Sequence, residues 1–326
     1  PLRSARPDIL VVTTPLMAYP QALEYDAKWY LAADVYQTVL AHLHPADDAD
    51  ASIAAYLRLG QCYRALSDVD PATEAFASAA EIATTSGDII GVLRARIGEA
   101  QVALIKGNVP TAERILDQTI ERAVGPEFRD VRSRALHDRA TVAYFRRQYE
   151  FAIRLAYDAL EISQSPSQRD RILSDIAASF MELGVHSAAR DAYLVISATA
   201  QDQFMRWSAT LNLMEIAFKT GVETQFELYR RHLNEAKLPP LMTTAFEMST
   251  GLGYRAFGDL NKARHHLQHA LAMATTHGFN QYLFEAEEAL LQLNKPTPLR
   301  TGTVELSLDT EEVALAIREL RESVGV

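Results

Sequence analysis

Apolar residues along this chain recur every three or four positions, in segments separated by short polar stretches. This spacing predicts amphipathic helices, because residues three and four apart share one face of a helix. In residues 51–88, two such stripes flank the polar stretch Ser67–Pro71, which predicts two antiparallel helices joined by a tight turn. The stripes consist of Tyr56, Leu59, Gly60 and Tyr63 in the first helix and Ala72, Phe76 and Ala79 in the second.

The hairpin pattern repeats at nearly constant intervals. One position opens the second helix of each unit, and successive occurrences are 40, 40, 40, 37, 37 and 37 residues apart. A fixed period in this range predicts a solenoid, in which one supersecondary unit is stacked many times. The position is alanine in every unit except one: Ala32, Ala72, Ala112, Ala152, Ala189, Phe226 and Ala263.

The unit resembles the tetratricopeptide repeat (TPR) family, whose pattern of aromatic, Leu-Gly, Tyr and then Ala, Phe, Ala is matched by the stripe residues of 51–88. The resemblance recurs along almost the whole chain. It implies an all-α protein, a right-handed α-solenoid of about seven TPR-like helix-turn-helix repeats with a C-terminal capping helix and a short tail. Because the family's usual repeat is about 34 residues, the longer units here predict longer helices or longer loops.

The pattern divides the chain into three parts. Residues 1–19 are expected to form an extended N-terminal segment, residues 20–295 the TPR solenoid, and residues 296–326 a C-terminal tail. Within the solenoid, Phe279–Lys295 is predicted to be a capping helix that turns its glutamates toward water.

Both ends of the chain contain candidate strands. Thr303–Leu308 alternates polar and apolar residues, and Ile9–Thr13 also looks extended. Asp309 with Glu312 predicts a capping box that opens a last helix. Three alternatives stay open: the strands pair with each other in a homodimer, one of them belongs to an absent domain, or both tails lack fixed structure.

Charge and composition narrow the function classes. The formal net charge is −10, which argues against direct nucleic-acid binding, since that binding depends on Lys and Arg at phosphates. No apolar run is long enough to span a membrane. The single cysteine, Cys62, excludes an intramolecular disulfide; it fits a reducing compartment, so a cytoplasmic protein is expected, and it is interpreted as a small core residue.

The first helices of successive hairpins carry a candidate binding groove. Arg94, Arg134 and Arg171 occupy one equivalent position, and an apolar row occupies another: Leu104, Tyr144, Met181 and Phe218. Such a surface suits a protein or peptide with acidic and apolar side chains, because Arg pairs with carboxylates through a planar fork of donors. The candidate peptide-binding residues are Arg58, Arg64, Arg94, Arg134, His137, Tyr144, Phe145, Arg171, Met181, Asn212 and Phe218.

Two alternatives weigh against this groove. The apolar row is also what a buried helical stripe looks like, and exposed arginines often pair locally with acidic residues such as Asp138 and Asp175. The clamp by which some TPR proteins hold a chaperone's C-terminal carboxylate needs Lys and Asn at set positions. Leu57, Gln61, Gly98 and Asp138 stand there instead, which disfavours that partner.

No catalytic or metal-binding pattern stands out. His265 and His269 are one helical turn apart and lie near His266 and His277, but no Glu or Cys in the sequence pattern completes a ligand set, and these positions are expected to face outward. No useful Ser-His-Asp spacing, Gly-rich phosphate loop or HExxH motif is present. We therefore expect no enzyme activity, no metal and no cofactor.

The sequence thus predicts a noncatalytic protein- or peptide-binding scaffold. The alternative is a peptide- or ligand-sensing effector domain of a bacterial transcription regulator, since the long repeats resemble those of bacterial regulators. The DNA-binding domain of such a regulator is absent from this sequence. The sequence begins with Pro1 rather than Met, as expected if an upstream segment has been removed.

Overall fold

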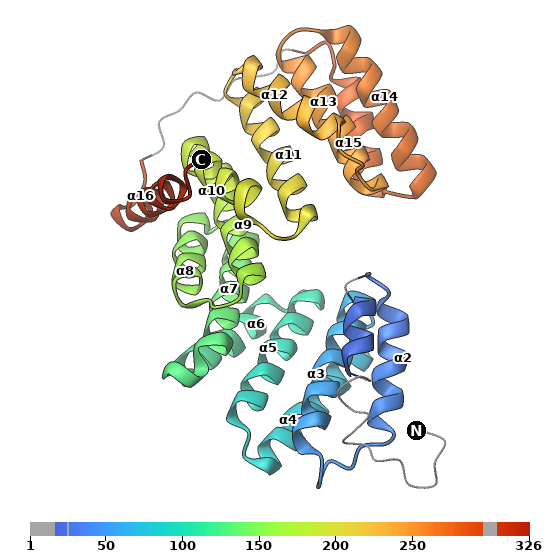
Figure 1. The fold of residues 1–326 in the computed structure, drawn as a ribbon, viewed down its shortest axis with the longest axis vertical. Coiled ribbons are helices and arrows are strands. Elements are labelled where there is room, and N and C mark those ends of the chain that lie inside the picture. Colours follow the sequence, from blue (N-terminus) through green and yellow to red (C-terminus); the bar gives the residue numbers. More distant parts are fainter. Residues whose placement is uncertain (1–16, 25, 296–304) are drawn as a thin grey trace. The chain divides into compact units, whose positions relative to one another are not determined.

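A computed structural model of the chain describes residues 17–24, 26–295 and 305–326 (Figure 1). Those residues are almost entirely helical and contain no β-strand. The expectation of an all-α protein is therefore confirmed. The chain forms two compact units: the first comprises residues up to Arg147 together with Glu161–Ser163, and the second comprises Gln148–Leu160 and the residues from Gln164 onward.

The first unit contains the helical hairpins α3–α4 and α5–α6, with α2 before them and α7 after them, and it begins with a helical segment over residues 17–24. Each helix packs against the next one in the chain, and α5 also contacts both α3 and α7. The elements are α2 (Trp29–Leu40), α3 (Ala49–Ala65), α4 (Val69–Ser86), α5 (Ile89–Ile105), α6 (Val109–Arg122), the 3-10 turn η1 (Pro126–Phe128) and α7 (Arg129–Phe145).

The second unit continues the same pattern and ends with a helix outside the repeat. Successive helices from α9 to α15 pack on one another, and α13 also contacts α11 and α15. The elements are α8 (Tyr149–Ile162), α9 (Pro166–Leu183), α10 (His186–Thr199), α11 (Gln203–Lys219), α12 (Glu223–Asn234), α13 (Pro240–Ala256), α14 (Leu260–His277), α15 (Asn280–Leu291) and α16 (Leu308–Ser323).

The repeated small residues lie in the core, as their spacing predicts. All seven positions of the 40- and 37-residue series are at most 2% exposed. Close approach is needed at Gly98, where a Cβ would lie 2.3 Å from the ring of Phe76. Cys62 is fully buried, and this burial raises the pKa of its thiol to about 12, so it is a core residue as interpreted.

The turn inside each hairpin places one residue in the left-handed backbone region. The turn position follows the same 40- and 37-residue intervals as the core series. Glycine fills it in four units, which is expected because glycine has no Cβ penalty at positive φ. The residues are Ala27, Ser67, Gly107, Arg147, Gly184, Gly221 and Gly258, with φ between 55° and 88°.

The chain ends differ in part from the sequence expectations. The candidate strand Ile9–Thr13 and residues 303 and 304 lie outside the described residues, and residues 305–307 have no regular structure. The predicted capping box was wrong: Ser307 is the N-cap of α16, and the Asp309 side chain pairs with Arg154 instead. The glutamates of α15 are exposed, as predicted for a capping helix.

Candidate binding surface

Three first helices of the first unit, α3, α5 and α7, bring together a set of polar side chains. We call this set the first-helix face; it consists of Arg64, Arg94, Gln101, Arg134 and Asp138. At its centre the Gln101 amide donates a 2.7 Å hydrogen bond to Asp138 Oδ2. Burial raises the pKa of Asp138, although the hydrogen bond from Gln101 and the nearby positive charges oppose that rise.

Arg64 contributes an unused donor to the first-helix face. Its Nε atom is buried and has no hydrogen-bond partner among the residues that the structure describes. Its positive charge acts on Asp138, which places the guanidinium close to the Gln101–Asp138 pair. A buried donor without a partner is costly, and Arg64 as a whole is only partly buried, so the accessible part of its guanidinium favours an acceptor from a partner.

The two arginines of the predicted row that belong to the first unit are held by one carboxylate. Asp130 Oδ2 lies 3.3 Å from Arg94 Nη2 and 3.3 Å from Arg134 Nε. All three side chains are almost half exposed, so these ion pairs contribute little to stability. Local pairing, the alternative interpretation of the arginines, is therefore present, through Asp130 rather than Asp138.

Arg58 is engaged by the start of the chain. Its Nη1 lies 3.2 Å from Glu24 Oε2, and the hydroxyl of buried Tyr36 donates a 2.5 Å hydrogen bond to the other oxygen of Glu24. Burial and the hydrogen bond to Glu24 raise the pKa of Tyr36. Arg58 therefore connects α3 to the helical segment of residues 17–24 and is not part of the first-helix face.

The end of α7 carries the aromatic candidates. The rings of Tyr144 and Phe145 lie edge to face with centroids 6.1 Å apart, and Phe145 is 70% exposed. His137, the residue that precedes Asp138 on α7, is partly buried, and its electrostatic interaction with that aspartate lowers the pKa of Asp138. The first unit thus combines polar groups and an exposed aromatic on one helix.

The remaining candidates belong to the second unit. Arg171 is exposed on α9 and Met181 is partly buried on the same helix. On α11, the side-chain amide of Asn212 donates a 2.9 Å hydrogen bond to the Ser208 carbonyl. Phe218, on the same helix, packs against the hydrophobic core of the second unit. The continuity of the arginine row from Arg134 to Arg171 stays a prediction.

The apolar row contributes to the cores of both units. Leu104 packs against the cluster that contains Leu93 and Leu116, and the ring of Phe218 lies 6.4 Å from that of buried Phe226. The interpretation of this row as core therefore holds for these two residues. An apolar contact for a partner is better supplied by exposed Phe145.

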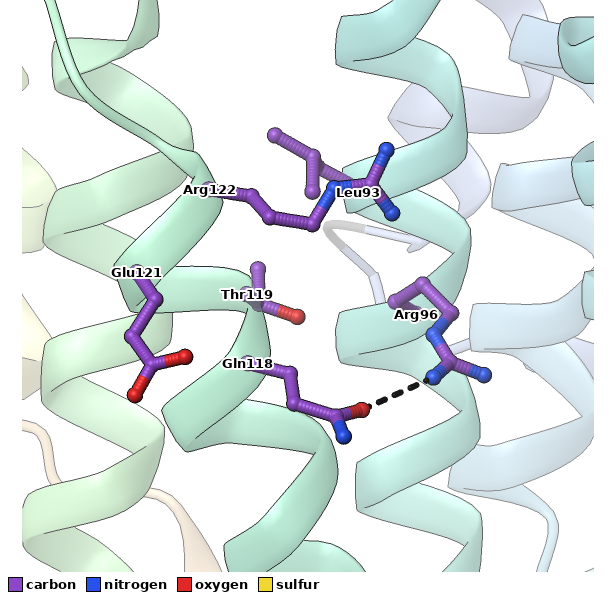
Figure 2. A pocket seen from close by; sticks show the side chains of 6 residues that line it. All are labelled: Leu93, Arg96, Gln118, Thr119, Glu121 and Arg122. Carbon is purple, nitrogen blue, oxygen red and sulfur yellow. Dashed lines mark hydrogen bonds between the residues drawn. The ribbon is translucent and has the colours of Figure 1, made fainter.

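A pocket of about 260 Å³ lies between α5 and α6 of the first unit, apart from the candidate residues (Figure 2). Arg96, at the edge of the pocket, forms a 3.0 Å ion pair with Glu99 and donates a 3.3 Å hydrogen bond to Gln118 Oε1. Its positive charge is thus largely neutralised. The lining residues are Leu93, Arg96, Gln118, Thr119, Glu121 and Arg122.

The histidine cluster differs from its sequence interpretation. Glu247 of α13 contacts Nδ1 of His266 at 2.7 Å and Nδ1 of His269 at 3.2 Å, and His266 is partly buried rather than facing outward. The expectation that these positions face outward is therefore wrong for His266, and the sequence pattern did not reveal that Glu247 lies beside two of the histidines. The part of the chain that the structure describes nevertheless contains no group of three or more His, Cys, Asp or Glu side chains arranged to hold a metal ion.

Among the described residues, no helix has the length and apolar character to cross a membrane. No family model matches the sequence, and no curated protein matches it. Similarity appears instead among solved structures.

Three solved structures share the fold. The apo form of the quorum sensor NprR from B. thuringiensis is 14% identical, with a TM-score of 0.57, covering 88% of this chain and 77% of that one. A Rap protein complexed with competence and sporulation factor is 15% identical, with a TM-score of 0.55 and coverages of 95% and 87%. A tetratricopeptide repeat protein from Parabacteroides merdae is 15% identical, with a TM-score of 0.50 and coverages of 84% and 98%. The chain therefore has the α-solenoid fold of tetratricopeptide repeat proteins.

Proposed function

We propose that this chain is a noncatalytic module that binds a protein or peptide segment bearing acidic and apolar side chains. The first-helix face of α3, α5 and α7 is the binding surface. The observation that carries the proposal is the buried Arg64 Nε, which lacks a partner among the described residues, beside the partly buried Gln101–Asp138 pair. A carboxylate of the bound segment pairs with the accessible part of the Arg64 side chain, beside this donor.

The neighbouring arginines add selectivity for acidic residues. Arg94 and Arg134 pair with the exposed carboxylate of Asp130, which is a weak interaction. A carboxylate from a partner can therefore replace Asp130 at small cost. Phe145, which is 70% exposed beside Tyr144, offers the apolar contact, because aromatic side chains supply much of the energy of protein interfaces.

The structural relatives support a ligand-binding role. The Rap protein was solved with competence and sporulation factor bound, and NprR is a quorum sensor. These likenesses also favour the second candidate function, a ligand-sensing effector domain of a bacterial transcription regulator. A cytoplasmic location fits both functions and fits the single buried thiol of Cys62.

Selection from a random peptide library on the immobilised full chain tests the proposal. We expect the enriched peptides to contain Asp or Glu beside aromatic or aliphatic residues, and Arg64→Gln to weaken their binding at least tenfold in fluorescence anisotropy. Arg114→Gln is the matched control, because Arg114 is exposed on the second helix α6. It is expected to leave affinity unchanged.

Enrichment of basic peptides, or equal losses in the two variants, would contradict this assignment. The two candidate functions differ in the response to ligand. A sensing domain changes conformation or assembly on binding, so saturating peptide should alter the sedimentation coefficient or the scattering profile of the chain. A passive scaffold shows neither change.

A further inference from the structure

The last helix packs far from its sequence neighbours. Helix α16 contacts α8 and α10 of the second unit, although it follows α15 in the chain (Figure 1). The contacting residues are 157 and 130 positions apart along the sequence. Repeats in a solenoid normally contact only their neighbours, so this long-range contact sets α16 apart from the repeat architecture.

The start of α16 is held by residues of α8. Glu150 Oε2 accepts 3.0 Å hydrogen bonds from the Ser307 amide and the Thr310 hydroxyl. The hydrogen bonds from Ser307 lower the pKa of Glu150. Arg154, also on α8, pairs with Asp309. A carboxylate at the N-terminus of a helix is favoured by the helix dipole, so Glu150 recognises the start of a helix.

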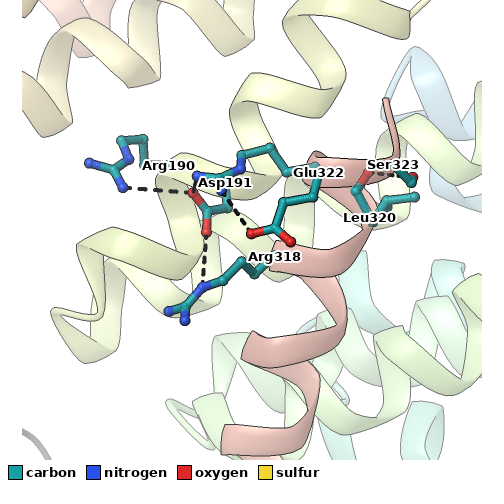
Figure 3. A network of polar contacts seen from close by, with 7 residues as sticks. Arg190, Asp191, Arg318, Leu320, Glu322 and Ser323 are labelled. Carbon is teal, nitrogen blue, oxygen red and sulfur yellow. Dashed lines mark hydrogen bonds and ion pairs between the residues drawn. The ribbon is translucent and has the colours of Figure 1, made fainter. Parts of the chain in front are cut away.

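The end of α16 is held by a buried carboxylate of α10. The Asp191 side chain is only 3% exposed, and its oxygens lie 2.9 Å from Arg321 Nη1 and 3.9 Å from Arg318 Nε (Figure 3). Arg190, its neighbour on α10, is 3.8 Å away. A buried carboxylate requires a cationic partner, and α16 supplies the nearest one.

Between these two ends, α16 contributes few apolar side chains. Val313 and Ile317 are the apolar residues of α16 that are buried, with Thr310 beside them at the helix start. Leu308 and Leu315 remain exposed. The apolar part of this contact therefore rests on two aliphatic side chains, and the polar pairs at the two ends of the helix supply the rest.

We infer that the surface of α8 and α10 is a recognition site for an amphipathic helix, and that α16 is its intramolecular ligand. The site fits a partner helix of the same pattern: Ser at the cap, Thr three residues later, β-branched residues three and seven positions beyond that Thr, and Arg four positions further. A partner helix of this pattern binds by displacing α16. This site differs from the first-helix face proposed above and does not depend on it.

The test uses the full chain with a protease site introduced between residues 296 and 304 and cleaved after folding. The probe is a labelled synthetic peptide of residues 305–326. We expect the cleaved protein to bind the peptide saturably and the intact chain to bind it at least tenfold more weakly, because tethered α16 competes at high effective concentration.

Variants on both partners identify the contact. Arg321→Glu is made in the peptide, so the protein is unchanged, and it is expected to weaken binding at least tenfold. Glu150→Gln is made in the protein and is expected to weaken binding several-fold. Glu161→Gln is the matched control, since Glu161 is exposed near the end of the same helix. Equal binding of a scrambled peptide, failure of the peptide to exchange after cleavage, or unfolding of the second unit when α16 leaves would each overturn the inference.

Discussion

Arg134 illustrates how an exposed charged residue can matter for binding without mattering for stability. Its side chain is 46% exposed and its partner Asp130 is 45% exposed. An ion pair in such surroundings contributes about 0–1 kcal/mol to the free energy of unfolding. The energetic value of this guanidinium therefore lies in what it binds.

We predict that Arg134→Glu weakens binding of acidic peptides at least tenfold and changes the free energy of unfolding by less than about 1 kcal/mol. Anisotropy titration and urea denaturation followed by circular dichroism measure the two effects. Arg114→Glu on α6 is the control for the charge change. Loss of the helical fold in Arg134→Glu would show that the residue is structural.

His186, the first residue of α10, is predicted to make stability depend on pH. Burial and the positive charge of Lys219 lower its pKa below 6.5, against the opposing charge of Glu215. The unfolded chain therefore binds a proton more readily, so the contribution of His186 is fully present above pH 6.5 and is lost as the pH falls toward the folded-state pKa. The urea concentration at the unfolding midpoint should therefore decrease when the pH is lowered from 7.5 to 5.

The His186→Gln variant tests this assignment, because glutamine does not titrate. We expect its urea midpoint to change less between the two pH values than that of the parent chain. His265→Gln serves as the control, since His265 is exposed on α14. An unchanged pH dependence in His186→Gln would assign the effect to other groups.

Side-chain partners could be predicted from the sequence only when they were close in the chain. Asp130 holds Arg134 one turn away on the same helix, but it also reaches Arg94 from a different hairpin. His266 turns inward because Glu247, on the preceding helix, accepts from it. The period identifies the helix but not the rotation of each side chain toward its neighbour, so these contacts required coordinates.

At the scale of the element, the turn inside each hairpin carries a backbone requirement that three repeats meet poorly. Ala27, Ser67 and Arg147 adopt φ of 55° to 59°, whereas the equivalent residues in the other units are glycines. A residue with a Cβ in the left-handed region loses about 1–2 kcal/mol, part of which is offset by its lower entropy in the unfolded chain.

We predict that Ser67→Gly and Arg147→Gly each stabilise the chain by about 0.5 kcal/mol in urea denaturation. The reciprocal control is Gly107→Ala, where an added Cβ meets no atom within 4 Å, so any loss reports the backbone alone. It should destabilise by about 1 kcal/mol. Destabilisation by both glycine variants would contradict this explanation.

Most helices were predictable from the sequence because small residues at a fixed period mark the positions where two helices pack closely together. The ends of elements were less predictable. Asp309 and Glu312 have the spacing of a capping box, yet Ser307 occupies the N-cap position of α16, and Asp309 lies within the first turn, where it pairs with Arg154 of α8. Local capping signals compete with tertiary partners that the local sequence does not reveal.

At the scale of the whole molecule, we expect the repeats to stay folded without the C-terminal tail. Deleting residues 301–326 removes α16 while leaving the contacts between successive repeat helices intact. We predict that the array remains helical and that amide hydrogen exchange increases in α8 and α10, with no change in α3–α7. Hydrogen-exchange mass spectrometry measures this. Loss of protection throughout α9–α15 would make the tail part of the core.

The docking of α16 was the part of the fold that the sequence could not reveal. Its stripe of Val313 and Ile317 predicts an amphipathic helix, but an apolar stripe does not identify the surface that it covers. Glu150 and Asp191 look like ordinary acidic residues of repeat helices. Their role depends on a contact with residues more than 100 positions away.

The position of α16 after the repeats sets the order in which its contacts form. Repeats built on neighbour contacts can fold as they leave the ribosome, at about 5–20 residues per second. Glu150 and Asp191 emerge well before Arg321, so their surface exists for several seconds before its own helix is made. During that interval the surface is open to any helix of the same pattern, including α16 of another copy of the chain.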